Sequence, residues 1–314
     1  MEEGSTTVRR RHRPHREANP LLVKELRGRM RGARAFVVLT VYLLLLGCLT
    51  SMVYYTYNAS VSGLGGALDT ADLGRTVFAT VVLIELFMVV FITPAFTAGA
   101  ISGERERQTY ELLRTTLLPA RRLVLGKLVS ALTYILLLVL AAVPLESLAF
   151  VLGGVVVEEL LLALVILLVT AFAFAVFGVF FSSLARTTLV STVLTYATAL
   201  LTTIGLPLLL LIFALVLVDP VASGLSSSAT SWALDAALAY ALYITAGLSP
   251  LTAAIFTEET LQQEGAVLYF WYQVDATHRV PIPSAWIVYT VAYLVLALVL
   301  LLITVLRVRR QETQ

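Results

Sequence analysis

The chain is 314 residues long, with 59% hydrophobic and only 13% charged residues, a mean hydropathy of +0.90 and a net charge of +2. Soluble domains use about 45–50% apolar and about 25% charged residues, so this composition excludes a soluble domain and predicts an all-α, polytopic membrane protein. The single cysteine, Cys48, excludes an intrachain disulfide and a cysteine-based metal site. We expect membrane lipids as neighbours and no nucleic-acid partner.

The chain begins with a basic tail, residues 1–18, whose arginines and histidines show no apolar periodicity. Such a tail is disordered, and it either touches anionic lipid headgroups or is simply solvated. From residue 19 to 34, an apolar stripe runs beside a basic face formed by Lys24, Arg27, Arg31 and Arg34. This pattern is typical of an amphipathic helix in the membrane interface, and we call the segment the elbow helix.

Six apolar runs, which together occupy residues 35–306, are long enough to cross a bilayer: about 35–57, 76–95, 123–150, 159–182, 187–218 and 285–306. A hydrocarbon core of about 30 Å needs roughly 20 helical residues. The fifth run is longer than this, so it must tilt, break or emerge, and Gly205 and Pro207 are its expected break points. The sequence therefore predicts six transmembrane helices.

The lysines and arginines indicate the orientation of these six crossings. With the N-terminus in the cytoplasm, 20 of the 22 basic residues lie on the cytoplasmic side, and only Arg75 and Arg279 lie outside. Positive residues near helix ends resist translocation. We therefore expect both termini in the cytoplasm, including a short tail over residues 307–314.

The segment 219–284 is expected on the outer side, between the last two crossings. Within it, residues 231–256 are apolar but are interrupted by an aspartate, a glycine and the Ser249-Pro250 pair. A full crossing there would export the C-terminal arginines, so we predict a re-entrant or interfacial helical region. Residues 257–284 combine carboxylates with four consecutive aromatic residues, which indicate either an interfacial aromatic belt or a gate or docking surface.

Residues 97–122 form a charged insert between the second and third runs. Its glutamates and arginines are spaced three or four residues apart, as Glu104 to Arg107 and Arg107 to Glu111, and each such pair adds about 0.2–0.5 kcal/mol to a helix. Pro119 then begins a second helix, whose basic residues are expected at the level of the lipid headgroups. We predict two short cytoplasmic helices.

Three stretches resemble the permease subunits of ABC-2 type ATP-binding-cassette transporters, especially the group that includes copper-enzyme maturation permeases. They are NPLLVKELRGRMRGARAF at 19–36, AFTAGAISGERERQTYELLRTTLLPARRLVLGKL at 95–128 and SSLARTTLVSTVLTY at 182–196. With the six crossings, the likeness covers nearly the whole chain. The chain departs from the pattern at Gln108, where glycine is common, and at Pro119, which stands about a residue later than usual.

The resemblance implies that the insert contains a coupling helix, which docks on a separate nucleotide-binding subunit. The implied contact residues are Glu104, Arg105, Glu106, Arg107, Tyr110 and Glu111. It also implies an exporter of a hydrophobic or amphipathic substrate in a prokaryotic plasma membrane, with two P-loop ATPase subunits and a second permease, identical or homologous. The alternative for the insert is a solvated loop whose charges only keep it out of lipid.

The chain is expected to be neither an enzyme nor a cofactor-binding protein. A P-loop needs a GxxxxGK[ST] frame, but the only Gly-Lys pair, Gly126-Lys127, is followed by Leu128 and lacks the first glycine. ATP and magnesium are therefore expected in the partner subunit. No histidine lies within an apolar run, so we expect no metal site and no catalytic residue in this chain.

Glu85, in the middle of the second run, supports a rival interpretation. An ionised carboxylate there costs roughly 2.5–3.5 kcal/mol, and such residues often mark ion paths. A proton-coupled carrier is therefore an alternative, as is a Glu85 that only bonds to a neighbouring helix, and a non-transporting anchor or sensor is a third. We interpret Glu146 as an interface residue. The expected translocation path contains Glu85, Thr202, Thr203, Gly205 and Pro207.

Overall fold

The computed structural model describes residues 33–63, 70–108, 119–213, 215, 231–274 and 278–312. The predicted basic tail and all but the last two residues of the predicted elbow helix lie outside these residues.

Six long apolar helical segments make the chain an integral membrane protein, and the predicted all-α, six-helix fold class is confirmed. Each segment contains most of one predicted apolar run. They are α2 (Ala33–Gly63), α3 (Thr70–Thr97), α6 (Ala120–Leu152), α7 (Val157–Leu184), the run of α8 (Thr188–Leu200), η1 (Leu201–Gly205) and α9 (Leu206–Phe213), and α13 (Ala285–Glu312).

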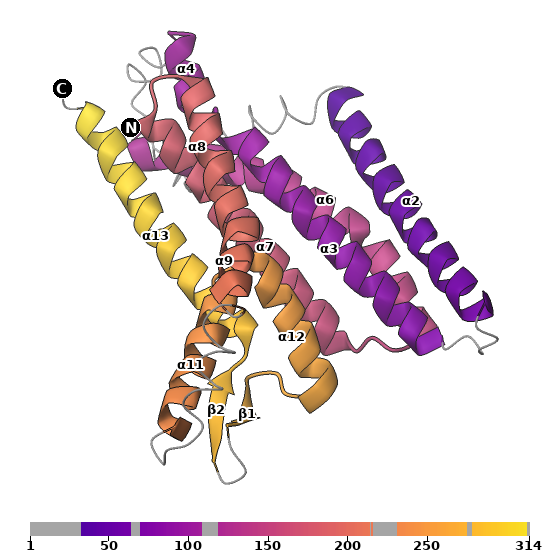
Figure 1. Cartoon of the computed structure of the whole chain (residues 1–314). Coiled ribbons are helices and arrows are strands. Elements are labelled where there is room, and N and C mark those ends of the chain that lie inside the picture. The colour runs from indigo at the N-terminus through magenta and orange to yellow at the C-terminus, as the bar shows by residue number, and fades with distance from the viewer. Residues whose placement is uncertain are drawn as a thin grey trace, which may run out of the picture.

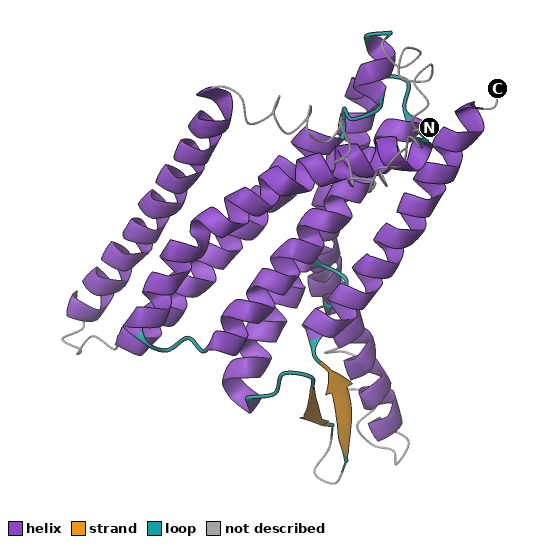
Figure 2. Cartoon of the chain, turned by 180° about the vertical axis from the view of Figure 1, so that it is seen from behind, coloured by secondary structure: helices purple, strands orange, loops and turns teal. Residues whose placement is uncertain are grey.

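The bundle has two distinct ends. The short helix α4 (Ser102–Glu106) and the last turn of α13 lie at one end, which we call the α4 end (Figure 1). The strands β1 (Tyr269–Gln273) and β2 (Arg279–Pro283) lie at the opposite end, which we call the hairpin end. Figure 2 shows the same arrangement from behind: in the part of the chain that is described, short loops and turns join the helices and the two strands.

The helix α7 forms the centre of the bundle. Its most apolar window is 67% buried inside the protein, against 17% for α2, which stands at the edge (Figure 1). A Cβ atom on Gly178 of α7 would lie 2.0 Å from the Oγ1 atom of Thr97 on α3, so only glycine permits this close approach. The core of the bundle is therefore built by packing α3, α6 and α13 directly on α7.

The fifth segment contains a π-helix and no break. Leu201–Gly205 is π-helical, and the chain then continues as α9 through Pro207 to Phe213, so the irregularity includes the predicted break point Gly205 and ends before Pro207. Proline has no N–H to donate to the carbonyl four residues earlier, which here belongs to Thr203. The hydroxyl of Ser249 donates to that carbonyl at 3.3 Å. The carbonyl of Thr203 thus finds its hydrogen-bond donor on another element.

That other element is a bent pair of helices, α11 (Ser231–Ala246) and α12 (Pro250–Glu264). The chain bends by 119° between them, so both helices extend from their shared turn toward the hairpin end (Figure 1). The hydroxyl of Tyr293 on α13 donates to the carbonyl of Leu248 in the turn at 2.9 Å. This arrangement agrees with the predicted re-entrant or interfacial helical region.

The β hairpin was not predicted from the sequence. Gly265, with φ at +61°, ends α12 in the left-handed conformation, and the chain then forms the antiparallel pair β1 and β2, with Trp271 opposite Pro281. Tyr243 of α11 makes edge contacts with the rings of Phe256 on α12 and of Phe270 and Tyr272 on β1. The aromatic segment therefore packs the hairpin on the bent helix pair.

Candidate functional site

The structure places the charged insert as a short helix held against three transmembrane helices. After α3, a turn over residues 98–101 leads into α4, and the N–H of Arg105 donates to the carbonyl of Ile101 at 3.2 Å. The second short helix is not separate, because Pro119 is followed at once by the long helix α6. Residues 109–118, with Tyr110 and Glu111, lie outside the described residues.

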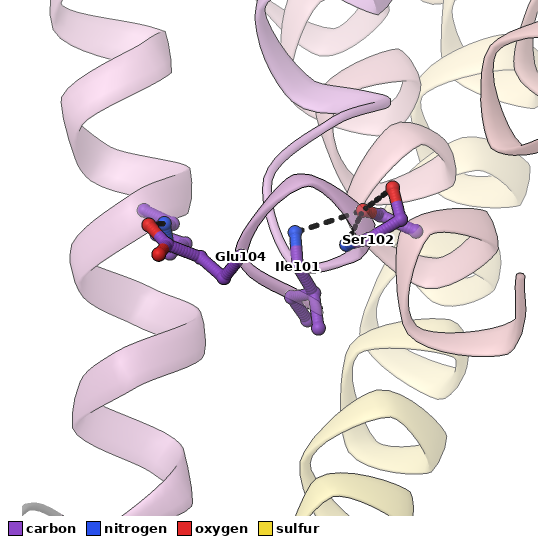
Figure 3. A network of polar contacts seen from close by, with 5 residues as sticks. Ile101, Ser102 and Glu104 are labelled. Carbon is purple, nitrogen blue, oxygen red and sulfur yellow. Dashed lines mark hydrogen bonds and ion pairs between the residues drawn. The ribbon is translucent and has the colours of Figure 1, made fainter. Parts of the chain in front are cut away.

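Ser182 of α7 fixes the start of α4. Its Oγ atom accepts hydrogen bonds from the backbone N–H groups of Ile101 at 2.8 Å and Ser102 at 2.9 Å, and lies 3.1 Å from the Oγ of Ser102 (Figure 3). Ile101, Ser102 and Ser182 are all buried. The first N–H groups of a helix have no partner within the helix, so Ser182 supplies the hydrogen-bond acceptor that α4 itself lacks.

Ser191 of α8 fixes the preceding turn, because its hydroxyl donates to the carbonyl of Ala98 at 2.6 Å. Sequence reasoning did not identify Ser182 or Ser191 as partners of the insert. The signal was nonetheless present, since both lie in the stretch 182–196 on which the resemblance depends.

The charged side chains of α4 also bond to the bundle. The Nζ of Lys127 on α6 lies 3.1 Å from the Oε1 of Glu104, and the Lys127 side chain is only 8% exposed. Lys127 is therefore buried in an ion pair between α6 and α4. The Nη1 of Arg105 donates to the carbonyl of Ala185 at 3.3 Å.

Glu106 binds the start of α8. Its two carboxylate oxygens accept from the N–H and the hydroxyl of Thr188, each at 2.8 Å. These bonds, the backbone one first, hold the pKa of the Glu106 carboxyl below its ordinary value. Together, the side chains of Glu104, Arg105 and Glu106 connect α4 with α6, the end of α7 and α8.

The tip of the insert is exposed. Arg107 and Gln108 are both exposed to solvent, and Gln108 has a φ of +57°, in the left-handed region that favours glycine. A glutamine in this conformation leaves a strained backbone at the tip.

Glu85 lies in a buried group of ionisable side chains. It is fully buried in α3, and it interacts electrostatically with Glu146 of α6 and Tyr42 of α2, which are also buried. Glu146 faces the interior of the bundle, toward Glu85. Neither carboxyl oxygen of Glu85 has a hydrogen-bond partner among the described residues.

The other predicted path residues lie elsewhere. Thr202 donates to the carbonyl of Thr198 at 2.9 Å, and the carbonyl of Thr203 faces Ser249 in the bent helix pair. Glu85 instead faces α2 and α6, so the structure does not bring it together with Thr202 and Thr203. Gly205 ends the π-helix and Pro207 follows in α9.

The basic elbow residues are outside this site. Lys24, Arg27 and Arg31 lie outside the described residues, and Arg34 belongs to the first turn of α2. Within the described ranges, the chain has no group of three or more His, Cys, Asp or Glu residues that could hold a metal ion.

The comparisons with known proteins found no family model and no curated protein that matches this chain.

Proposed function

We propose that the chain is the membrane permease of an ATP-driven transporter of the ABC-2 type, with α4 as the coupling helix. The observation that supports this proposal is the attachment of α4 to three spanning helices by Ser182, Lys127 and Thr188. A force applied to α4 is passed on directly to α6, α7 and α8, because each bond is short and joins α4 to one of them. A solvated loop would not need such bonds.

The rest of the complex follows from this role. A separate P-loop ATPase subunit binds ATP and magnesium and docks at the exposed tip formed by Arg107 and Gln108. Six spanning helices with one coupling helix resemble half of a transporter, so the complex contains two permease subunits and two ATPase subunits. The second permease is another copy of this chain or a homologue of it.

The proposed setting is a prokaryotic plasma membrane. The α4 end faces the cytoplasm together with both termini, in agreement with the distribution of basic residues. The hairpin end faces outward. The cargo is hydrophobic or amphipathic, and its direction of transport is outward.

Purification of the tagged full-length chain from its native membrane tests the proposal. We expect a P-loop ATPase to co-purify, and we expect Arg107→Glu to weaken its retention severalfold, because the change reverses the charge of the exposed tip. Arg121→Glu is the matched control, since Arg121 is exposed in the first turn of α6 at the same end. Absence of any ATPase, or equal loss in both variants, contradicts the proposal.

Reversal of the α4 glutamates is a poorer test. Glu104 pairs with Lys127 and Glu106 accepts from Thr188, so lysine at either position breaks bonds that hold α4 in place. Loss of coupling in such variants would not distinguish damage to α4 from loss of docking.

Proton-coupled transport is a second candidate, favoured by the buried group of Glu85, Glu146 and Tyr42. Two carboxyl groups that face each other in an apolar interior repel each other when both are ionised, and a proton bound by one of them relieves this repulsion. Glu85→Gln distinguishes the two candidates, with Glu158→Gln, an exposed residue at the start of α7, as control. ATP-dependent transport that survives Glu85→Gln and does not follow a pH gradient excludes the proton carrier.

A further inference from the structure

A cleft of about 320 Å³ lies between α3, α7 and α12, on the hairpin side of the bundle. Its walls are almost entirely apolar and include Phe78, Val82 and Leu86 of α3, Leu162 and Ile166 of α7, and Ile255 of α12. Small-molecule pockets in proteins have volumes of about 300–1,000 Å³, mostly apolar walls and a few polar groups that orient the ligand. This cleft has the same construction, and none of the functional roles above uses it.

The polar groups of the cleft are carboxylates. Glu159 of α7 and Glu258 and Glu259 of α12 all line it, and Glu258 lies close enough to Glu159 for the two to repel. The cation that acts on this pair is Arg75, whose Nε also donates to the carbonyl of Gly154 at 2.7 Å. Acidic groups therefore outnumber basic ones at the polar side of the cleft by three to one.

Each carboxylate is oriented by a hydrogen bond from its own neighbourhood. The backbone N–H of Val156 donates to the Oε2 of Glu159 at 3.1 Å. The side-chain amides of Gln262 and Gln263 donate to the Oε1 atoms of Glu258 and Glu259, at 2.7 Å and 3.1 Å. One oxygen of each carboxylate is thus fixed, and the second remains for a ligand.

Thr257 gives independent support for a ligand. It lines the same cleft and is 3% exposed, and its hydroxyl has no hydrogen-bond partner among the described residues. Burying a hydroxyl without a partner costs free energy, so native structures usually provide one. An N–H donor on a bound molecule would supply the missing partner.

We propose that this cleft binds an amphipathic organic cation, with its hydrocarbon part between α3, α7 and α12 and an ammonium group at the carboxylates. The apolar walls select the hydrocarbon, and the excess of acidic groups selects the cation over an anion or a neutral molecule of the same length. The ammonium N–H groups donate to Glu159, Glu258 and Thr257. This binding needs no ATPase and is independent of the function proposed above.

The test uses the full-length chain in nanodiscs of zwitterionic lipid, with a dodecylammonium probe that carries a photoreactive diazirine on its alkyl chain. We expect crosslinks to map to α3, α7 and α12. Unlabelled dodecylammonium should compete, whereas dodecanol, with the same chain and no charge, should not. Crosslinks spread evenly over lipid-facing residues, or equal competition by dodecanol, would overturn the proposal.

Two variants locate the site. Glu258→Gln keeps the shape of the side chain and is expected to weaken dodecylammonium binding about tenfold, which corresponds to roughly 1.4 kcal/mol. Glu264→Gln, on the same helix but outside the cleft, is the control and should bind normally. Ala79→Trp fills the cleft from an exposed position and should abolish the crosslinks.

Equal weakening in Glu258→Gln and Glu264→Gln would show a general effect of charge and would contradict a defined site. The result also separates this proposal from the one on transport. A chain that binds the probe but retains no ATPase disproves only the transporter role, whereas one that retains an ATPase but does not bind the probe disproves only this site.

Discussion

Different kinds of contact stabilise the two ends of the bundle. At the α4 end, short hydrogen bonds and an ion pair join α4 to α6, α7 and α8, with Ser182 accepting from two buried N–H groups. At the hairpin end, ring contacts add to hydrogen bonds from Tyr240 to the carbonyl of Pro281 and from Trp286 to the carbonyl of Val267. Tyr243 meets three aromatic rings, and Trp232 stacks on His278 with ring centroids 4.5 Å apart.

This difference has a mechanical consequence. A hydrogen bond weakens steeply when its distance or angle changes, so the α4 end can move only together with the helices to which it is bonded. Ring contacts depend on buried area and allow several geometries, so the hairpin end can repack while remaining closed. The α4 end is therefore suited to transmit motion, and the hairpin end to accommodate it.

The largest expected effect comes from Ser182→Ala. The change leaves the N–H groups of Ile101 and Ser102 buried without an acceptor, at about 1–3 kcal/mol for each unsatisfied group. We expect the free energy of unfolding in detergent to fall by about 2–4 kcal/mol, and hydrogen exchange in α4 to increase.

Ser183→Ala is the matched control for this change. The hydroxyl of Ser183 bonds only within its own helix, to the carbonyl of Phe180 at 2.7 Å, so its loss should cost about 1 kcal/mol or less. Equal destabilisation by the two variants would mean that Ser182 does not anchor α4.

The next effect is expected at the hairpin end, from Tyr243→Ala. Removal of this ring abolishes its edge contacts with Phe256, Phe270 and Tyr272, and such aromatic pairs contribute about 0.5–1.5 kcal/mol each. We expect local opening of β1 and β2 to become easier by about 2 kcal/mol, measured by hydrogen exchange. Exchange in α4 should not change.

Tyr269→Ala tests whether the effect is specific. Tyr269 is exposed on β1 and has an edge contact with Trp271, a neighbour on the same strand. Its removal should leave α11 in place. If Tyr243→Ala also loosens α4, the two ends are not independent, and the comparison between them fails.

Much of the fold is predictable because hydropathy and length determine it. Six runs of apolar residues give six spanning helices, and the Ser249-Pro250 pair within a seventh apolar stretch predicts the bent pair α11 and α12. The hairpin is not predictable in this way. Each strand has five residues, and Pro281 and Pro283 in β2 argue against a strand except at a sheet edge.

The contacts of the sites depend on tertiary structure. Ser182 and Ile101 are 81 positions apart, and no local pattern indicates that one bonds to the other. Glu146 belongs to a helix that is apolar on nearly every side, so periodicity does not reveal which face is inside. The charge pattern of the insert predicted a short helix, but not that Glu104 and Glu106 bond to the bundle rather than face outward.

A smaller effect is expected at the tip of α4, from Gln108→Gly. The left-handed backbone conformation costs a residue with a side chain about 1–2 kcal/mol. Glycine avoids this cost, but it loses more conformational entropy on folding, which offsets part of the gain in stability. We expect a net stabilisation of up to about 1 kcal/mol in thermal unfolding. Arg107→Gly, where φ is −82°, should destabilise instead. A Gln108→Gly variant that loses stability would contradict the assigned strain.

The smallest effect concerns Glu106, which is exposed, and it is best seen through pH. Because hydrogen bonds from Thr188 lower the pKa of Glu106 in the folded state, its contribution to stability is fully present above the unfolded pKa, near 4.5. It is lost as the pH falls through the folded pKa. The difference in thermal stability between the natural chain and Glu106→Gln should therefore be constant near neutral pH and vanish in acid. A difference that grows below pH 4.5 would mean that the carboxylate does not hold α8 to α4, and that the polar attachment of this end depends on Ser182 and Lys127 alone.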